Sequence, residues 1–211
     1  MTSKQTQAAS TVEAIRTLWQ KGFLAAGDGN FSFKVGDECF ITPSGVRKCD
    51  LEPERFVSLE DGAGASSEAL MHKTVFESAP KAKVVFHAHP PTAIAYSIAS
   101  NEKRLPNNLM SELILSVGEM PIANYARPGS ENMGNVLRPY LPHSRVIILK
   151  HHGALSWGES VDEALNGMER LEHTCEILLK IKGFGGAKAV LPDQEVEWLK
   201  QKRKKLGERT L

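Results

Sequence analysis

Apolar residues recur at helical spacing in several parts of this chain. In residues 11–22 they fall three or four positions apart, which predicts an amphipathic helix. Ser160-x-x-Glu163 has the pattern of a capping box and predicts the start of a longer helix. The apolar stripe of that helix is expected to face the core and comprises Val161, Leu165, Met168, Leu171, Cys175 and Leu178. Further helices are expected from Ser66-Ser67-Glu68 to about Ser78, after Pro91, and after Ser130 as an N-cap.

Short apolar runs between these helices predict strands. Residues 31–35 and 38–42 flank Gly36-Asp37, a strong signal for a hairpin turn. Val84-Val85-Phe86 and Val146-Ile147-Ile148-Leu149 indicate two buried strands, and residues 55–60 and 119–124 indicate two shorter ones. Because tight hairpins occur among the helices, we expect an α/β fold with a mixed, mostly antiparallel sheet covered by helices.

Composition narrows the class of protein further. With 211 residues, 41% of them apolar, we expect one compact domain spanning residues 1–211. The formal net charge of +1 gives no overall attraction to nucleic acid or to a membrane surface. No apolar run approaches the roughly 20 residues of a membrane span, and the polar start predicts no secretory signal. A basic run at residues 200–205 is interpreted as a solvated part of a C-terminal helix or tail, at about residues 192–211.

The cysteines indicate a reducing compartment. Cys39, Cys49 and Cys175 are widely spaced and form no C-x-x-C pair. This spacing argues against a disulfide framework and against a thiolate zinc site. We therefore expect a cytoplasmic location.

Two buried strands end in histidines. His87-Ala88-His89 follows the first, and side chains two apart on a strand point the same way, with Cα atoms roughly 6–7 Å apart. The second strand ends in His151-His152-Gly153. Three converging imidazoles with one open position are the pattern of a catalytic zinc site. Either His151 or His152 is the third ligand on this reasoning, and the alternative is half-exposed polar residues at strand ends. His72, His143 and His173 fit no spacing with this set.

Three short loops are rich in glycine, serine and asparagine. They contain Gly29-Asn30, Ser44-Gly45 and Ser66-Ser67, and each alone is compatible with an ordinary turn. Together they are typical of a phosphate site made from hydroxyls and backbone N–H groups, because Ser66-Ser67 opens a helix. Glu68 has two interpretations: an acid in the first helical turn that interacts with the dipole, or a carboxylate that moves a proton beside the anion and the metal.

The chain resembles the class II aldolase/adducin family. The blocks that carry the resemblance occur in the order and spacing of that family, over roughly residues 10 to 185: Gly29-Asn30-Phe31-Ser32, Ile41-Thr42-Pro43-Ser44-Gly45, Ser66-Ser67-Glu68, His87-Ala88-His89 and His152-Gly153. Within the family the sequence is most similar to the short fuculose-1-phosphate aldolase branch. The resemblance implies a three-layer α/β/α fold and a homotetramer with active sites between subunits.

The resemblance also implies roles for particular residues. His87, His89 and His152 would hold one Zn²⁺ per subunit, with His151 a neighbour, and Glu68 would be the catalytic acid/base. The substrate phosphate would be bound by Gly29, Asn30, Ser44, Gly45, Ser66 and Ser67. The implied reaction is reversible cleavage of a ketose 1-phosphate into dihydroxyacetone phosphate and an aldehyde, through a zinc-stabilised enediolate.

The sequence departs from the fuculose branch in its tyrosines. That branch uses a tyrosine from a neighbouring subunit and another in the C-terminal tail. Here Met110 lies near the first position, and no tyrosine follows Leu191. Glu112 is a candidate second acid/base, as a glutamate in this region serves the family's methylthioribulose-phosphate dehydratases; the alternative is a solvated helix glutamate. Fuculose itself is therefore not the expected substrate.

Rival functions share the same metal site. They are a sugar-phosphate dehydratase, a decarboxylase and a 4-epimerase, although the epimerases of the family carry aspartate where this chain has Glu68. An adducin-like interaction module would keep the fold without catalysis. Retention of all three candidate histidines and of Glu68 argues against that module, since a binding surface has no need for them.

Overall fold

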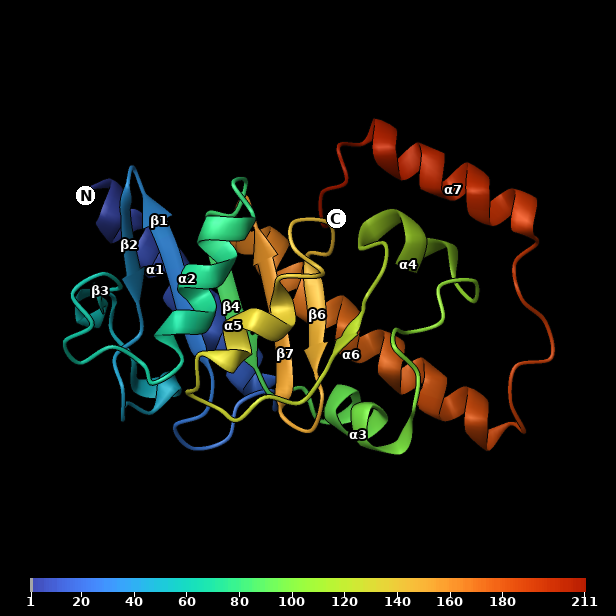
Figure 1. The fold of residues 1–211 in the computed structure, drawn as a ribbon, viewed down its shortest axis with the longest axis horizontal. Helices are drawn as coiled ribbons and strands as arrows, with labels where there is room; N and C mark the ends of the chain where they lie inside the picture. The colour runs from blue at the N-terminus through green and yellow to red at the C-terminus, as the bar shows by residue number, and fades with distance from the viewer. Residues whose placement is uncertain (1) are drawn as a thin grey trace.

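The structure, a computed structural model, describes residues 2–211. In this part of the chain one seven-stranded sheet forms the middle layer (Figure 1). Its strands are β1 (Asn30–Val35), β2 (Glu38–Ile41), β3 (Val57–Ser58), β4 (Val84–Ala88), β5 (Ile122–Ala123), β6 (Val146–Leu149) and β7 (Gly153–Gly158). The order across the sheet is β3-β2-β1-β4-β7-β6-β5. Neighbouring strands are antiparallel except β5 and β6, which are parallel, so the prediction of a mixed, mostly antiparallel sheet is confirmed.

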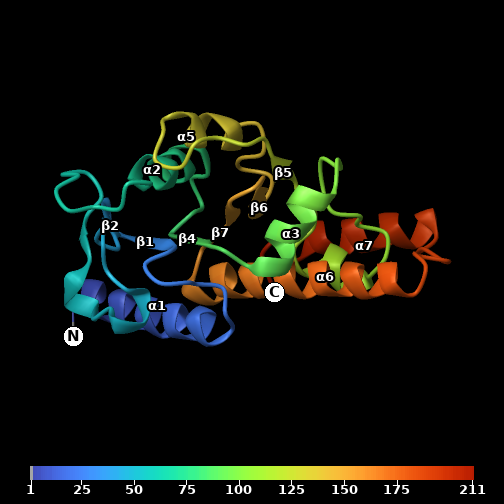
Figure 2. The same cartoon turned by 90° about the horizontal axis from the view of Figure 1, so that it is seen from below.

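Helices cover both faces of this sheet, as the three-layer prediction requires. Figure 2 shows α2 and α5 over one face and α1 and α6 over the other. The α-helices are α1 (Ser3–Gln20), α2 (Ala69–Ser78), α3 (Pro91–Ala99), α4 (Ser111–Ser116), α5 (Asn132–Leu137), α6 (Val161–Gly183) and α7 (Asp193–Lys205). Two short 3₁₀ helices, η1 (Lys48–Asp50) and η2 (Pro53–Arg55), lie between β2 and β3. None of these helices is both long and apolar enough to span a membrane.

Alternation along β4 sends its apolar side chains into two different core clusters, one on each face of the sheet. On β4, Val84 and Phe86 pack into the cluster that contains α1 and α6 side chains, whereas Val85 packs into the cluster with α2 and α5. Burying each large apolar side chain contributes about 1.5–3 kcal/mol. By the same alternation His87 lies on the α2 side of the sheet, with Val85. The polar residues that β1 and β4 place on this side therefore lie beneath α2.

The N-terminal helix begins earlier than the apolar pattern predicts. α1 starts at Ser3 because Thr2 and Gln5 form a capping box there. The predicted capping box at Ser160 is only half formed: its hydroxyl accepts a hydrogen bond from the Glu163 N–H. The Glu163 carboxylate instead accepts from the backbone N–H of Glu159 and pairs with Arg145. An ion pair with a buried arginine therefore takes the place of the second capping bond.

Two sequence-based expectations are corrected by the structure. Ser130 is not the N-cap of α5, because Glu131 occupies that position and the Ser130 hydroxyl donates to the Arg127 carbonyl oxygen. The basic run in α7 is not wholly solvated. Arg203 is buried, and its guanidinium donates to the carbonyl oxygens of Leu115, Glu208 and Arg209. This arginine ties α7 to the end of α4 and to the C-terminal residues.

Candidate metal centre and adjoining pocket

The sheet order brings the two histidine-terminated strands together. β4 and β6 are separated by β7, which pairs antiparallel with both. Ala88 at the end of β4 lies opposite Ala154 at the start of β7. The turn that joins β6 to β7 therefore lies beside the end of β4, and it carries His152. β7 was not predicted from the sequence, yet it is the element that makes the site.

The turn between β6 and β7 separates the roles of its two histidines. His151 adopts a left-handed backbone (φ 60), and its N–H donates to the buried Ser97 hydroxyl. The His151 ring lies 6.3 Å from that of Tyr125, whereas the His152 ring lies 4.7 Å from His87 and 5.1 Å from His89. His87, His89 and His152 offer nitrogen atoms that all lie within 4.8 Å of one another. Of the two candidates for third ligand, His152 is the one in the cluster.

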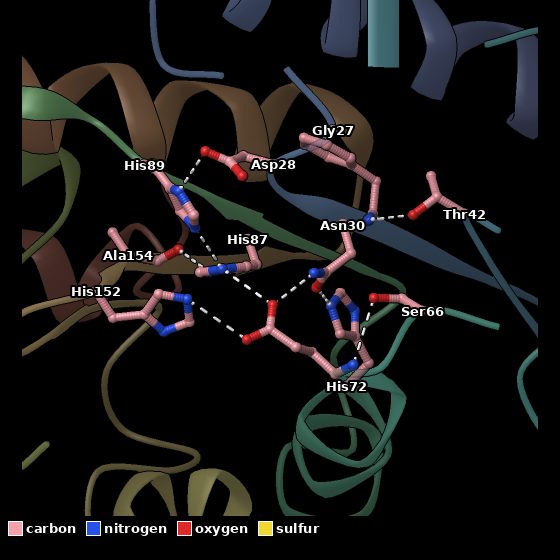
Figure 3. Close-up of polar contacts among 12 residues, drawn as sticks. Gly27, Asp28, Asn30, Thr42, Ser66, His72, His87, His89, His152 and Ala154 are labelled. Carbon is pink, nitrogen blue, oxygen red and sulfur yellow. Dashed lines mark hydrogen bonds and ion pairs between the residues drawn. The ribbon is translucent and has the colours of Figure 1, made fainter. Parts of the chain in front are cut away.

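The outer partners of the rings fix which nitrogens face the cluster (Figure 3). His87 Nδ1 lies 3.0 Å from the Ala154 carbonyl oxygen, and His89 Nδ1 lies 3.2 Å from the Asp28 carboxylate. Both partners are acceptors, so each Nδ1 carries the hydrogen and each Nε2 presents a lone pair. The two Nε2 atoms are 3.1 Å apart. Two facing lone pairs at this distance repel one another unless a cation lies beside them, which fits a metal centre.

Glu68 completes the cluster from the opposite side. It is the N-cap residue of α2, and one carboxylate oxygen, Oε2, lies 3.2 Å from His87 Nε2. The other, Oε1, lies 3.5 Å from His152 Nε2. It is buried and has no hydrogen-bond partner among residues 2–211. A buried acceptor without a donor is costly, and a divalent cation would satisfy it. Zinc takes histidine nitrogen and carboxylate oxygen as ligands, so these residues fit it.

Burial sets the charge of the cluster. Desolvation, reinforced by the two neighbouring histidines, lowers the pKa of His87 well below its ordinary value. Desolvation also lowers the pKa of His152 to about 4. The imidazoles of His87 and His152 are thus neutral near pH 7, the form that binds metal. Desolvation raises the pKa of Glu68, against the opposing effect of a hydrogen bond from Asn30.

The three predicted loops meet beside this cluster. All six predicted phosphate-binding residues line one cavity of about 170 Å³, together with Glu68 and His89; the six are Gly29, Asn30, Ser44, Gly45, Ser66 and Ser67. The cavity therefore joins a set of hydroxyls and backbone N–H groups to the candidate metal centre. An anion bound at one end of a small molecule would bring the other end to the histidines.

Lys48 also lines this cavity and was missed by the sequence analysis. Its side chain is buried, and its ammonium donates to the carbonyl oxygens of Gly27 (2.9 Å) and Val46 (2.8 Å). These carbonyls belong to two of the three loops, so the lysine ties the loops together. Burial lowers the pKa of Lys48, and the nearby Asp28 opposes that shift. No sequence signal separated this lysine from a surface one.

Asp28, Ser32 and His72 are three further site residues that the sequence analysis did not identify. His72 was set aside for its spacing, but it lies one helical turn beyond Glu68, and its ring is fully buried against Asn30 and Ser32. The separations from Glu68 to His72 and from Asn30 to Ser32 match one helical turn and one strand repeat. Those periodicities were the available signal.

Glu112 lies away from this cavity. It is exposed on α4, and hydrogen bonds from its own backbone N–H and from the Ser111 hydroxyl lower its pKa. It does not line the cavity that contains Glu68. Within one chain, the structure therefore does not bring this candidate second acid to the site.

Comparisons with known proteins agree with this geometry. The chain is 28% identical over 173 residues to a 3-oxo-tetronate 4-phosphate decarboxylase of Escherichia coli O6:H1, covering 77% of this chain and 81% of that protein. It is 29% identical over 198 residues to a methylthioribulose-1-phosphate dehydratase of Methylococcus capsulatus, covering 86% and 97%. The crystal structure of L-fuculose-1-phosphate aldolase from Thermus thermophilus superposes with a TM-score of 0.78 at 30% identity, covering 88% and 98%.

A family model spans most of the chain. The model described as the class II aldolase and adducin N-terminal domain matches residues 9–179, which include every strand of the sheet, the three clustered histidines and Glu68. The structural match covers 88% of the chain and agrees with the mixed sheet covered by helices. The chain therefore belongs to the class II aldolase and adducin family.

Proposed function

We propose that this protein is a divalent-metal-dependent lyase that breaks a carbon–carbon bond beside the carbonyl of a phosphorylated sugar. The first candidate reaction is reversible cleavage of a ketose 1-phosphate into dihydroxyacetone phosphate and an aldehyde. One observation carries the proposal: three imidazoles and the Glu68 carboxylate converge next to a cavity lined by the glycine- and serine-rich loops. Two of the relatives above, the decarboxylase and the aldolase, are named for breaking a carbon–carbon bond, and all three are named for reactions on phosphorylated compounds.

The loops would fix the position of the substrate. A phosphate held by Ser44, Ser66 and the neighbouring backbone N–H groups would place the rest of a short sugar toward His89 and Glu68. The cavity is small, so it suits the phosphate end of the molecule. Holding that end would orient the reacting carbon toward the catalytic groups, which lowers the entropic part of the activation barrier.

Glu68 would move the proton. Cleavage leaves the bonding electron pair on the carbon next to the carbonyl, as an enediolate, and a proton must then be added to that carbon. Oε2 already accepts a hydrogen bond from Asn30, so Oε1, which would leave the cation when the substrate binds, is the oxygen that would deliver or remove the proton. Burial, which raises the pKa of Glu68, favours the protonated form that this step needs. A divalent cation such as Zn²⁺, held by His87, His89 and His152, would supply positive charge that stabilises the negative charge developing on the substrate.

Decarboxylation is a second candidate, and one observation favours it. Aldol cleavage requires a second group to take the hydroxyl proton of the departing aldehyde, whereas departing CO₂ carries no such proton. Apart from Glu68, the titratable side chains that line the cavity within one described chain are Asp28, Lys48 and His89. Asp28 pairs with His89, and Lys48 is bonded to two carbonyls. A single available acid is sufficient for decarboxylation.

Proton exchange on dihydroxyacetone phosphate tests both candidates. Removal of CO₂ from a 3-oxo-tetronate 4-phosphate also leaves dihydroxyacetone phosphate, so the two reactions share one enediolate. In D₂O, we expect the zinc-loaded protein to exchange one hydrogen at the hydroxymethyl carbon of dihydroxyacetone phosphate, which NMR would detect. We expect Glu68→Gln to bind zinc but not to catalyse this hydrogen exchange. Two assays then separate the reactions. Condensation of dihydroxyacetone phosphate with a panel of aldehydes tests aldol chemistry, and CO₂ release from 3-oxo-tetronate 4-phosphate tests decarboxylation. Zinc binding without exchange on wild-type protein contradicts the proposal.

Assembly and location stay predictions. We expect a homotetramer with each active site completed by a neighbouring subunit, which would supply the second acid for aldol cleavage. Light scattering tests the tetramer directly. We also expect the protein to act in the cytoplasm and not to bind nucleic acid or membranes.

A further inference from the structure

A continuous line of hydrogen bonds runs from the middle of the sheet to Glu68. The Ser32 hydroxyl lies 2.6 Å from His72 Nδ1, and His72 Nε2 lies 2.6 Å from Asn30 Oδ1. Asn30 Nδ2 in turn donates to Glu68 Oε2 at 2.6 Å. All four residues are buried, and the His72 ring is fully inaccessible. Figure 3 shows His72 and Asn30 side by side, to the right of the histidine cluster.

The fold places these residues together for simple reasons. Asn30 and Ser32 are two apart on β1, and Asn30 lies opposite His87 on β4, so all three side chains point to the α2 side of the sheet. Glu68 and His72 are one turn apart on the side of α2 that faces the sheet. The line therefore joins β1 to α2 without passing through any of the three clustered histidines.

The direction of every bond in this line is fixed. The Glu68 oxygen accepts, so Asn30 must present its NH₂ group there and its carbonyl oxygen to His72. His72 Nε2 must then carry the hydrogen, which leaves Nδ1 as an acceptor for the Ser32 hydroxyl. Ser32, His72 and Asn30 each donate toward Glu68.

We propose that His72 and Ser32 are positioning residues that hold the Asn30 amide in one orientation, so that Asn30 fixes Glu68 by Oε2 and leaves Oε1 facing the substrate. Without His72, Asn30 Oδ1 loses its donor, and the amide is held only by its bond to Glu68. An amide held at one end can shift, so it no longer keeps the Glu68 carboxylate in one place. The carboxylate then turns away from the position that proton transfer requires. This inference rests on the proposed function for its catalytic consequence, but the orientation itself is a property of the protein alone.

The first test needs no substrate. Long-range ¹H–¹⁵N NMR of the metal-free protein reports which ring nitrogen of each neutral histidine carries the hydrogen, and the signal missing in His72→Gln identifies His72. We expect the Nε2–H form with a strongly hydrogen-bonded Nδ1. The Nδ1–H form overturns the proposal, because it reverses the direction of the hydrogen bonds. The Asn30 NH₂ group would then point toward His72 and not toward Glu68.

The second test separates positioning from structural support. His72→Gln keeps an NH₂ group close to the place of Nε2, whereas His72→Leu keeps bulk without a donor. We expect His72→Leu to lower kcat for proton exchange by about 10- to 100-fold, with KM and zinc content near wild type. His72→Gln is expected to recover most of that loss. Equal kcat in wild type and His72→Leu, or parallel losses of zinc, KM and kcat, overturn the positioning role.

A milder variant covers the case in which His72→Leu does not fold. Ser32→Ala removes only the first donor, and we expect a smaller fall in kcat and a weaker hydrogen bond at His72 Nδ1 in the NMR experiment. An unchanged His72 Nδ1 shift in Ser32→Ala contradicts the line of bonds. If the NMR results are as expected while the wild-type protein exchanges no proton on any phosphorylated ketone, the proposed function fails and the orientation of the Asn30 amide stands.

Discussion

Gly153 lies directly against the ring of His89. A Cβ atom at residue 153 would lie 2.5 Å from the Ala88 carbonyl oxygen, 2.7 Å from His89 Cδ2 and 3.1 Å from His87 Cε1. The first two of these distances are shorter than side-chain carbons tolerate, and two of the neighbours are metal-site rings. The first residue of β7 must therefore lack a side chain for the histidines of β4 to keep their positions.

We expect Gly153→Ala to weaken zinc binding by about 10-fold or more, because displaced rings lose ligand geometry as they do when outer-shell partners are removed. Competition with a chelator measures the dissociation constant. Gly183→Ala is a matched control, since an added Cβ there meets nothing within 4 Å. An unchanged zinc affinity in Gly153→Ala contradicts the close approach.

Removing one histidine of the cluster should remove the metal without unfolding the chain. We expect His87→Ala and His152→Ala each to lose zinc, measured by elemental analysis, and to lose activity, while far-UV circular dichroism stays near wild type. The reason is that the rings terminate strands whose pairing does not depend on them. His173→Ala on the exposed side of α6 is the control and should keep one zinc per chain. Full zinc content in either cluster variant refutes the ligand assignment.

Asp28 should act on the metal through His89. Its carboxylate accepts the hydrogen of His89 Nδ1, which fixes the ring and makes Nε2 a stronger donor to the ion. We expect Asp28→Asn to weaken zinc binding by about 10- to 100-fold. Saturating zinc should restore the metal content, which distinguishes this effect from the loss of a ligand. The same affinity in wild type and Asp28→Asn would show that the contact has no role.

The sequence predicted the candidate metal ligands better than it predicted the strands and side chains that position them. His87, His89 and His152 lie at the ends of apolar strands, and this pattern can be recognised in the sequence alone. β7 was missed because the stretch from Gly153 to Gly158 is short and has only two large apolar residues, Leu155 and Trp157. Its role depends on pairing with β4, which is distant in sequence, and pairing of that kind is not encoded locally.

His72 shows the same limit within the site. A histidine on an otherwise ordinary helix is interpreted from sequence as surface or structural, because its partners lie about forty residues away on β1. Lys48 likewise became a site residue only when two loops met around it. Contacts of this kind depend on the whole fold, whereas the Ser66-Ser67-Glu68 and Gly29-Asn30 blocks depend on local helix and turn chemistry.

Acid should destabilise the metal-free protein partly through His72. Burial lowers its pKa to about 3 in the folded chain, from an ordinary value of 6.5. Below pH 6.5 the unfolded chain therefore binds a proton that the folded chain does not, and stability falls as the pH decreases toward 3. The limiting slope for one such group is about 1.4 kcal/mol per pH unit.

Urea denaturation of chelated protein between pH 7 and 5 measures this slope. We expect His72→Gln to have a shallower pH dependence than wild type, because its side chain does not titrate. The other buried histidines remain in both proteins, so the difference between the two slopes isolates His72. Parallel curves for wild type and variant would mean that His72 takes up a proton as readily in the folded state as in the unfolded one.

Lys48 should control the affinity for the phosphate. Lys48→Met keeps the length of the buried side chain but removes the ammonium that ties the Gly27 and Val46 carbonyls together. Losing hydrogen bonds to a charged group costs about 1.5–3 kcal/mol, so we expect the KM for a phosphorylated substrate to rise about 10- to 100-fold. The kcat should change little, since Glu68 and the histidines make no contact with the ammonium. Calorimetric titration with inorganic phosphate gives a readout independent of turnover, and Lys202→Met, an exposed lysine of α7, is the control. Equal phosphate affinity in Lys48→Met and wild type would show that the two loops keep their shape without this lysine.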